Sequence, residues 1–254
     1  MMMKTNMKYK KAGLLIGLIA GAVAPAMASA VISVPSVGLN VDGQSYELPR
    51  PVPAKDENGK DIWIMEEWKM ANSEFEITLG ATLNPDPSIA YGIAVIDLGA
   101  PSAFAFFFST PIVPTGSPNT VSGSVVGGLT DATGNGVSIT PTGSSLQIND
   151  LIAPITNMGV DVGIANVHPA SGTPGSFFTY GAYAAGPIAG PGPGPWTGIN
   201  VSLGFTLSGG GDVAALTGFA SIDPTIVPET STTLAGGALA LGVAGWAFRR
   251  RNRA

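Results

Sequence analysis

Short runs of alternating hydrophobic and polar residues fill the middle of the chain, and turn-forming residues separate them. The runs FEITLGATL (75–83) and SIAYGIAVIDL (88–98) stand on either side of NPDP, a strong turn sequence. A period of two places every second side chain on the same face of a sheet. Residues 31–227 show no long stretch with the period of an amphipathic helix. This pattern predicts an all-β body.

Eight further segments are bounded by Gly, Pro, Asn and Ser in the same way. They are 103–113, 120–129, 136–140, 145–152, 158–167, 176–185, 198–208 and 212–222. About ten short strands with frequent turns are typical of a sandwich or a barrel, and we expect a sandwich-like body.

Two segments are less regular. FAFFF (104–108) predicts a strand buried on both faces or packed at a junction of sheets, because bulky residues follow one another without alternation. DIWIMEEWKMAN (61–72) fits either a single helix or an irregular strand.

The first thirty residues have the composition of a secretory signal peptide. Residues 1–11 carry four lysines and no acid, and residues 12–24 are apolar. Ala28 and Ala30 then occupy the small positions of an A-x-A cleavage site, so we expect cleavage after Ala30. The alternative is an uncleaved anchor, for which the apolar run is short.

A second apolar segment lies near the carboxyl end. Residues 232–248 contain no charge, and Arg249, Arg250, Arg251 and Arg253 follow them. A helix of this length reaches about 25 Å, slightly less than the roughly 30 Å of a hydrocarbon core. The sequence predicts a transmembrane helix with the body outside, because arginines favour the cytoplasmic side. They also argue against the alternative, a buried helix that ends a globular domain.

Val227, Pro228 and Glu229 precede this helix, so a short motif, an apolar span and an arginine cluster follow one another to the chain end. This order resembles the PEP-CTERM sorting signal of Gram-negative bacteria, with Thr230 in place of the motif's second proline. The resemblance is limited to residues 227–254. It implies export, transient anchoring in the inner membrane and cleavage near the motif by an exosortase.

The same resemblance implies a final location at the cell surface or outside the cell. Such proteins often occur in bacteria that make an exopolysaccharide matrix, so extracellular polysaccharide is an expected partner beside the exosortase and the export machinery. The chain thus divides into a signal peptide at 1–30, an exported all-β body at 31–227 and a sorting segment at 228–254.

Charge and cysteine content narrow the choice of partners. The body has four basic and sixteen acidic residues, a net charge of −12, and no Lys or Arg occurs between Ala71 and Phe248. No basic patch can form there, so we expect no binding to nucleic acid. The chain has no cysteine, and the fold must therefore rest on its core alone.

Candidate catalytic residues are few. The single histidine, His168 in NVHPASG, is expected in a loop, and no G-x-S-x-G sequence occurs. One histidine without cysteine does not predict a zinc site. The densest carboxylate group is Glu66, Glu67, Glu74 and Glu76. We expect these residues to face solvent, because a glycosidase usually takes its two carboxyls from separate elements.

Two polar loops lie between expected strands. KDENGKD (55–61) and DATGNG (131–136) predict polar hairpin turns. A calcium loop is the alternative for the first, but the twelve-residue pattern and its terminal glutamate are not matched.

Three tryptophans lie near expected loops. Trp63, Trp68 and Trp196 are the aromatic residues best placed to stack on sugar rings, and we expect at least two of the three to pack in the core. We expect no catalytic residue, cofactor or metal, and predict an exported surface or matrix protein with a structural or adhesive role. The alternatives are a carbohydrate-binding sandwich module and a secreted glycoside hydrolase that uses carboxylates alone.

Overall fold

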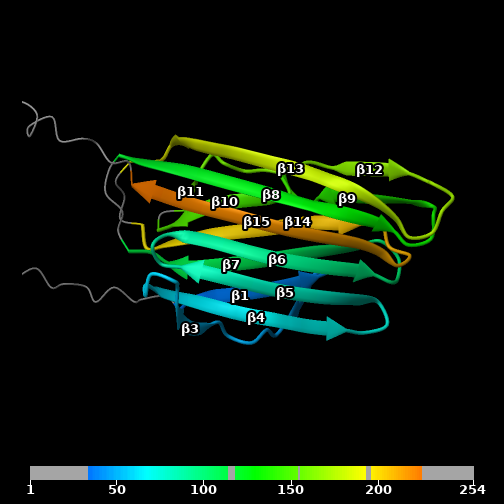
Figure 1. Cartoon of the computed structure of the whole chain (residues 1–254), viewed down its shortest axis with the longest axis horizontal. Coiled ribbons are helices and arrows are strands. Elements are labelled where there is room, and N and C mark those ends of the chain that lie inside the picture. Colours follow the sequence, from blue (N-terminus) through cyan, green and yellow to red (C-terminus); the bar gives the residue numbers. More distant parts are fainter. Residues whose placement is uncertain (1–33, 114–117, 154, 193–195, 225–254) are drawn as a thin grey trace, which may run out of the picture. The chain divides into compact units, whose positions relative to one another are not determined.

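Two antiparallel β-sheets make up the part of the chain that the structure describes (Figure 1). This computed structural model describes residues 34–113, 118–153, 155–192 and 196–224. These residues form fifteen strands and no helix. The prediction of an all-β, sandwich-like body is confirmed, although the strands are more numerous than the sequence indicated.

The first sheet has eight strands, and its long central strand, β14, pairs with three others. The spatial order is β11 (Thr156–Asn157), β10 (Gln147–Ile152), β14 (Gly198–Leu207), β7 (Ser102–Pro111), β1 (Ser36–Val41) and β2 (Gln44–Tyr46), while β9 (Gly136–Pro141) pairs with β14 and with β12 (Asn166–Pro169).

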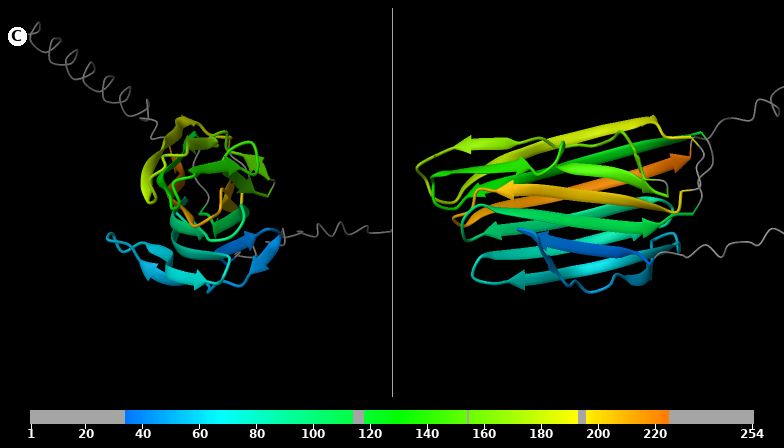
Figure 2. Two further views of the ribbon diagram at one scale, coloured as in Figure 1. Left: turned by 90° about the vertical axis from the view of Figure 1, so that its right-hand side faces the viewer. Right: turned by 180° about the vertical axis from the view of Figure 1, so that it is seen from behind.

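The second sheet has seven strands in an unbroken row. Its order is β13 (Ser176–Ala189), β8 (Asn119–Asp131), β15 (Asp212–Pro224), β6 (Ser88–Asp97), β5 (Phe75–Asn84), β4 (Asp61–Ala71) and β3 (Val52–Lys55). Figure 2 shows its strands facing those of the eight-stranded sheet.

The hairpin β5–β6 follows the predicted pattern residue by residue. The two strands pair in continuous register from Phe75 opposite Asp97 to Asn84 opposite Ser88. Every second residue of β5 is buried, beginning with Phe75. At the turn, the Asn84 side chain accepts a 2.9 Å hydrogen bond from the Asp86 N–H. Alternation and turn chemistry therefore agree along this hairpin, and together they fix its register.

The core lies between the two sheets and is rich in aromatic side chains. Phe75 of β5 meets Phe104 of β7 edge to face, with 5.9 Å between the ring centroids. Tyr91 of β6 stacks on Phe108 of β7 with 4.6 Å between centroids. Each such pair contributes about 0.5–1.5 kcal/mol beyond the apolar area that it buries. These contacts join the sheets without a disulfide.

The FAFFF run is a central strand with only one buried face. Phe104, Phe106 and Phe108 are buried, whereas Phe107 is 48 % exposed. Of the two alternatives expected for this run, burial on both faces is wrong, because only one face of β7 meets the other sheet. On the outer face the Phe107 ring lies next to Gly38 of β1, where an added Cβ would be 3.6 Å from the ring.

The predicted strand at 158–167 is also wrong. The structure has only an isolated β-bridge there, between Val162 and Gln147, and the first residues of β12. Gly159 and Gly163 both have positive φ, a conformation that interrupts a strand. At Gly163 an added Cβ would lie 2.8 Å from the Tyr180 hydroxyl, so only glycine fits.

The segment at 61–72 is strand β4, and the helix alternative is wrong. Met65 pairs with Ala81 and Trp68 pairs with Leu79, so β4 carries one extra residue between these positions. This β-bulge explains the irregular apolar pattern of the segment.

The expected signal helix and the expected transmembrane helix at 232–248 lie outside the described residues. Within the described ranges, no helix is long and apolar enough to cross a membrane.

Candidate functional site

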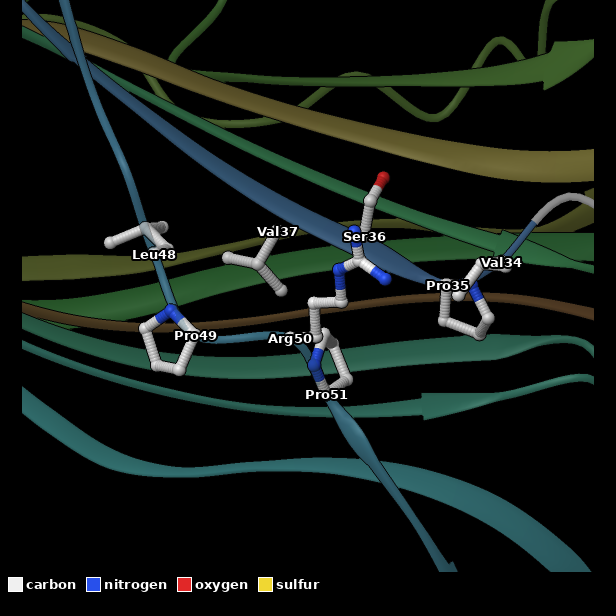
Figure 3. Close-up of a pocket in the computed structure, with 8 residues that line it drawn as sticks. All are labelled: Val34, Pro35, Ser36, Val37, Leu48, Pro49, Arg50 and Pro51. Carbon is white, nitrogen blue, oxygen red and sulfur yellow. The ribbon is translucent and has the colours of Figure 1, made fainter.

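A surface groove lies where the chain passes from the first sheet to the second. Residues 34–37 form one wall and residues 48–51 form the other, around a volume of about 300 Å³ (Figure 3). Pro35, Pro49 and Pro51 lie in these walls and fix the backbone φ, which stiffens the groove. Of the residues that line it, only Arg50 is charged. We call this the arginine groove.

A second groove lies on the other side of Pro49 and Arg50, which line both. It encloses about 250 Å³, and its far wall is residues 64–68 of β4. The bulge in β4 leaves Glu66 and Glu67 exposed directly before the half-buried Trp68. A bulge commonly re-aims side chains in this way. We call this the tryptophan groove.

Four basic side chains lie in the described residues, and Arg50 differs from the other three in having no partner within that part of the chain. Lys55 pairs with Asp61 at 2.6 Å, Lys69 pairs with Glu67 at 2.5 Å, and Lys60 pairs with Asp86. The hydrogen bond to Asp86 raises the pKa of Lys60. Arg50 is exposed and makes no hydrogen bond or ion pair with any residue in the described ranges. Its guanidinium is thus available to an outside ligand.

The two grooves together combine an indole, two carboxylates, a guanidinium and an apolar wall. An indole face packs against the C–H face of a sugar ring, and carboxylate or guanidinium groups bind its hydroxyls. Concave sites with a few convergent polar groups are the usual form of a ligand site. The arrangement therefore suits the binding of a sugar.

The tryptophans that the sequence singled out occupy different places. Trp68 lines the tryptophan groove, whereas Trp63 and Trp196 line neither groove. All three are half-buried and pack against the core cluster. The expectation that at least two of them pack in the core is confirmed.

The four clustered glutamates are all exposed, as expected. Glu66 and Glu67 border the tryptophan groove, while Glu74 and Glu76 line neither groove. Among the described residues, no group of three or more His, Asp or Glu side chains could hold a metal ion.

His168 lies in a strand, and its predicted loop position is wrong. It pairs with Val137 in β12, and its ring stacks on Phe178 with 4.3 Å between centroids. The following proline, Pro169, is tolerated because β12 is a short strand at the sheet edge. The Nε2 atom is buried and has no hydrogen-bond partner among the described residues.

The two polar loops have different outcomes. KDENGKD is the predicted hairpin turn between β3 and β4, in which Asp56 accepts hydrogen bonds from the N–H groups of Asn58 and Lys60. DATGNG is not a hairpin, because β8 and β9 belong to different sheets. Its first residue, Asp131, is buried and accepts the N–H groups of Gly134 and Gly136 at 2.7 and 2.8 Å.

Sequence reasoning did not assign Arg50 to a site. Its only signal is its position in LPRPV, where prolines flank a single cation.

The processing residues Ala28, Ala30, Val227, Pro228 and Glu229 lie outside the described residues, as do Arg249, Arg250, Arg251 and Arg253. Comparison with protein-family models, with curated proteins and with solved structures gave no match.

Proposed function

We propose that the chain is an exported cell-surface or matrix protein with a structural or adhesive role, and that an exosortase processes it. The signal-peptide pattern at 1–30 and the motif, span and arginines of 227–254 support export and sorting. The exosortase and the export machinery are its processing partners, and the inner membrane holds it only transiently.

One observation supports adhesion through the body. The arginine and tryptophan grooves place a guanidinium without a partner among the described residues, a half-buried indole and two exposed carboxylates on one continuous surface. This set of groups suits extracellular polysaccharide better than it suits nucleic acid, which requires a basic surface. A second candidate function, a dedicated carbohydrate-binding module, rests on the same observation.

A glycan array probed with the full chain tests adhesion and separates the two candidates. Selective binding in the nanomolar to micromolar range would favour the dedicated module, and weak binding to many glycans would favour a general adhesive role. Trp68→Ala should reduce the signal, and Trp63→Ala serves as the matched control outside the grooves. An array without any bound glycan would contradict adhesion through this surface.

A further inference from the structure

We propose that the two grooves are adjacent subsites for a glycan in which an acidic sugar adjoins a neutral one. Arg50 binds the carboxylate of the acidic sugar, and Trp68 stacks on the neutral ring. This inference rests on the proposed carbohydrate binding and adds the ligand's charge pattern to it.

The arginine groove is a positive site on an acidic body. Among the described residues that line it, Arg50 is the one charged residue, and none of them is an acid. The side chain extends across the groove toward Ser36 of the opposite wall (Figure 3). A guanidinium matches the two oxygens of a carboxylate. The groove therefore selects an anionic group.

The tryptophan groove has the opposite preference. Glu66 and Glu67 border it, and Lys69 neutralises Glu67 alone. A second carboxylate on the ligand would be repelled there, whereas the hydroxyls of a neutral sugar can donate to Glu66. The indole of Trp68 offers a stacking face for the same sugar.

The shared Pro49–Arg50 segment makes the two subsites contiguous. A uniformly acidic glycan would also face the net charge of −12 on the body, which repels polyanions at long range. A peptide with a terminal carboxylate could also use Arg50, so a peptide carboxylate is added as a competitor of the sugars. The surface thus favours a chain in which acidic and neutral sugars adjoin.

The test is titration calorimetry on the full chain in a detergent without a sugar headgroup. Three tetrasaccharides serve as probes: one of alternating glucuronate and N-acetylglucosamine, its carboxyl-reduced form, and one of uronate only. We expect the alternating probe to bind most tightly, by about tenfold over the reduced form, as for one charge-assisted contact. Arg50→Gln should abolish this preference by weakening binding of the alternating probe, whereas Arg50→Lys should retain part of it.

Lys55→Gln is the matched control, because it removes one exposed positive charge outside both grooves. It should leave the order of the probes unchanged. The proposal is overturned if the reduced form binds as tightly as the alternating probe, if the preference survives Arg50→Gln, or if a peptide carboxylate competes more strongly than the sugars. Equal binding of the reduced and alternating probes would contradict the proposed charge pattern but would still agree with carbohydrate binding. If none of the three probes binds, both the charge pattern and carbohydrate binding are rejected.

Discussion

The Tyr91 hydroxyl donates a 2.7 Å hydrogen bond to Oε1 of Gln147 across the buried core. This bond joins β6 of one sheet to β10 of the other. Nε2 of Gln147 donates to Oδ1 of Asn149 and to the carbonyl of Phe219, both at 2.9 Å. Asn149 in turn donates to the carbonyl of Val160 at 2.8 Å. Burial raises the pKa of Tyr91, so its hydroxyl remains a donor at physiological pH. A satisfied network of this kind fixes the alignment of the two sheets.

Tyr91→Phe should lower the free energy of unfolding by about 1–3 kcal/mol, because it leaves the buried Oε1 of Gln147 without its donor. Urea unfolding followed by circular dichroism measures this loss. Tyr183→Phe is the control: its hydroxyl is 3.5 Å from the carbonyl of Tyr180, so little should change. Equal stability of the two variants would contradict a structural role for the Tyr91 bond.

Gly218→Ala should destabilise the protein much more than Gly92→Ala. A Cβ at Gly218 would lie 2.1 Å from the Tyr91 hydroxyl, whereas a Cβ at Gly92 would meet nothing within 4 Å. Tyr91 cannot move aside without losing its hydrogen bond to Gln147. We therefore expect the free energy of unfolding to fall by about 1–3 kcal/mol for Gly218→Ala and by about 0.5 kcal/mol or less for Gly92→Ala. Thermal unfolding of both variants checks the difference, and a neutral Gly218→Ala would show that the ring lies elsewhere.

Asp97 should make stability depend on pH. Its burial raises the carboxyl pKa above the ordinary 3.8, and this outweighs the lowering by hydrogen bonds from Ser102. The folded state then holds the proton more tightly than the unfolded chain. This contribution is fully present below pH 3.8 and is lost as the pH rises through the raised pKa.

Unfolding experiments at several pH values check this sign. In the window above pH 3.8, Asp97→Asn should remove part of the decline in stability that accompanies rising pH. Burial also raises the pKa of the Asp150 carboxyl, so some decline of stability with rising pH should remain in the variant. A variant whose stability declines as steeply as that of the parent protein would assign the effect to other groups.

His168→Ala should cost about 0.5–1.5 kcal/mol, because it removes the ring that stacks on Phe178. His168→Phe keeps the stacking and replaces the buried, unpartnered Nε2, so it should be as stable as the parent protein or more so. Denaturant unfolding of both variants distinguishes them. If phenylalanine were as damaging as alanine, stacking would not be the role of this ring.

The sequence predicts the parts of the fold that local chemistry decides. The β5–β6 hairpin follows from alternation and a strong turn, and the KDENGKD turn follows from Asp56 and Gly59. The strand predicted at 158–167 was wrong because the apolar residues there contribute to the core from irregular backbone. The expectation that both faces of FAFFF are buried was wrong because composition alone does not distinguish a strand with one buried face from a strand with two.

The candidate site is less predictable because it is built from distant segments. Residues 34–37, 48–52 and 64–68 meet only after β2 and β3 have joined different sheets. Trp68 was recognised by its residue type, but no local pattern indicated the bulge that places it beside Arg50. Arg50 itself has no hydrogen-bond or ion-pair partner among the described residues, and this is a property of the folded surface.

We propose that export and sorting remove both ends of the chain and leave the β-sandwich body as the mature protein. Mass spectrometry of the protein recovered from producing cells tests it most directly. We expect a chain that begins at Val31 and ends between residues 228 and 230, with uncut precursor accumulating in the membrane when the four terminal arginines are changed to glutamine. Recovery of a peptide spanning residues 238–248 from mature surface protein, in cells with an active exosortase, would contradict it.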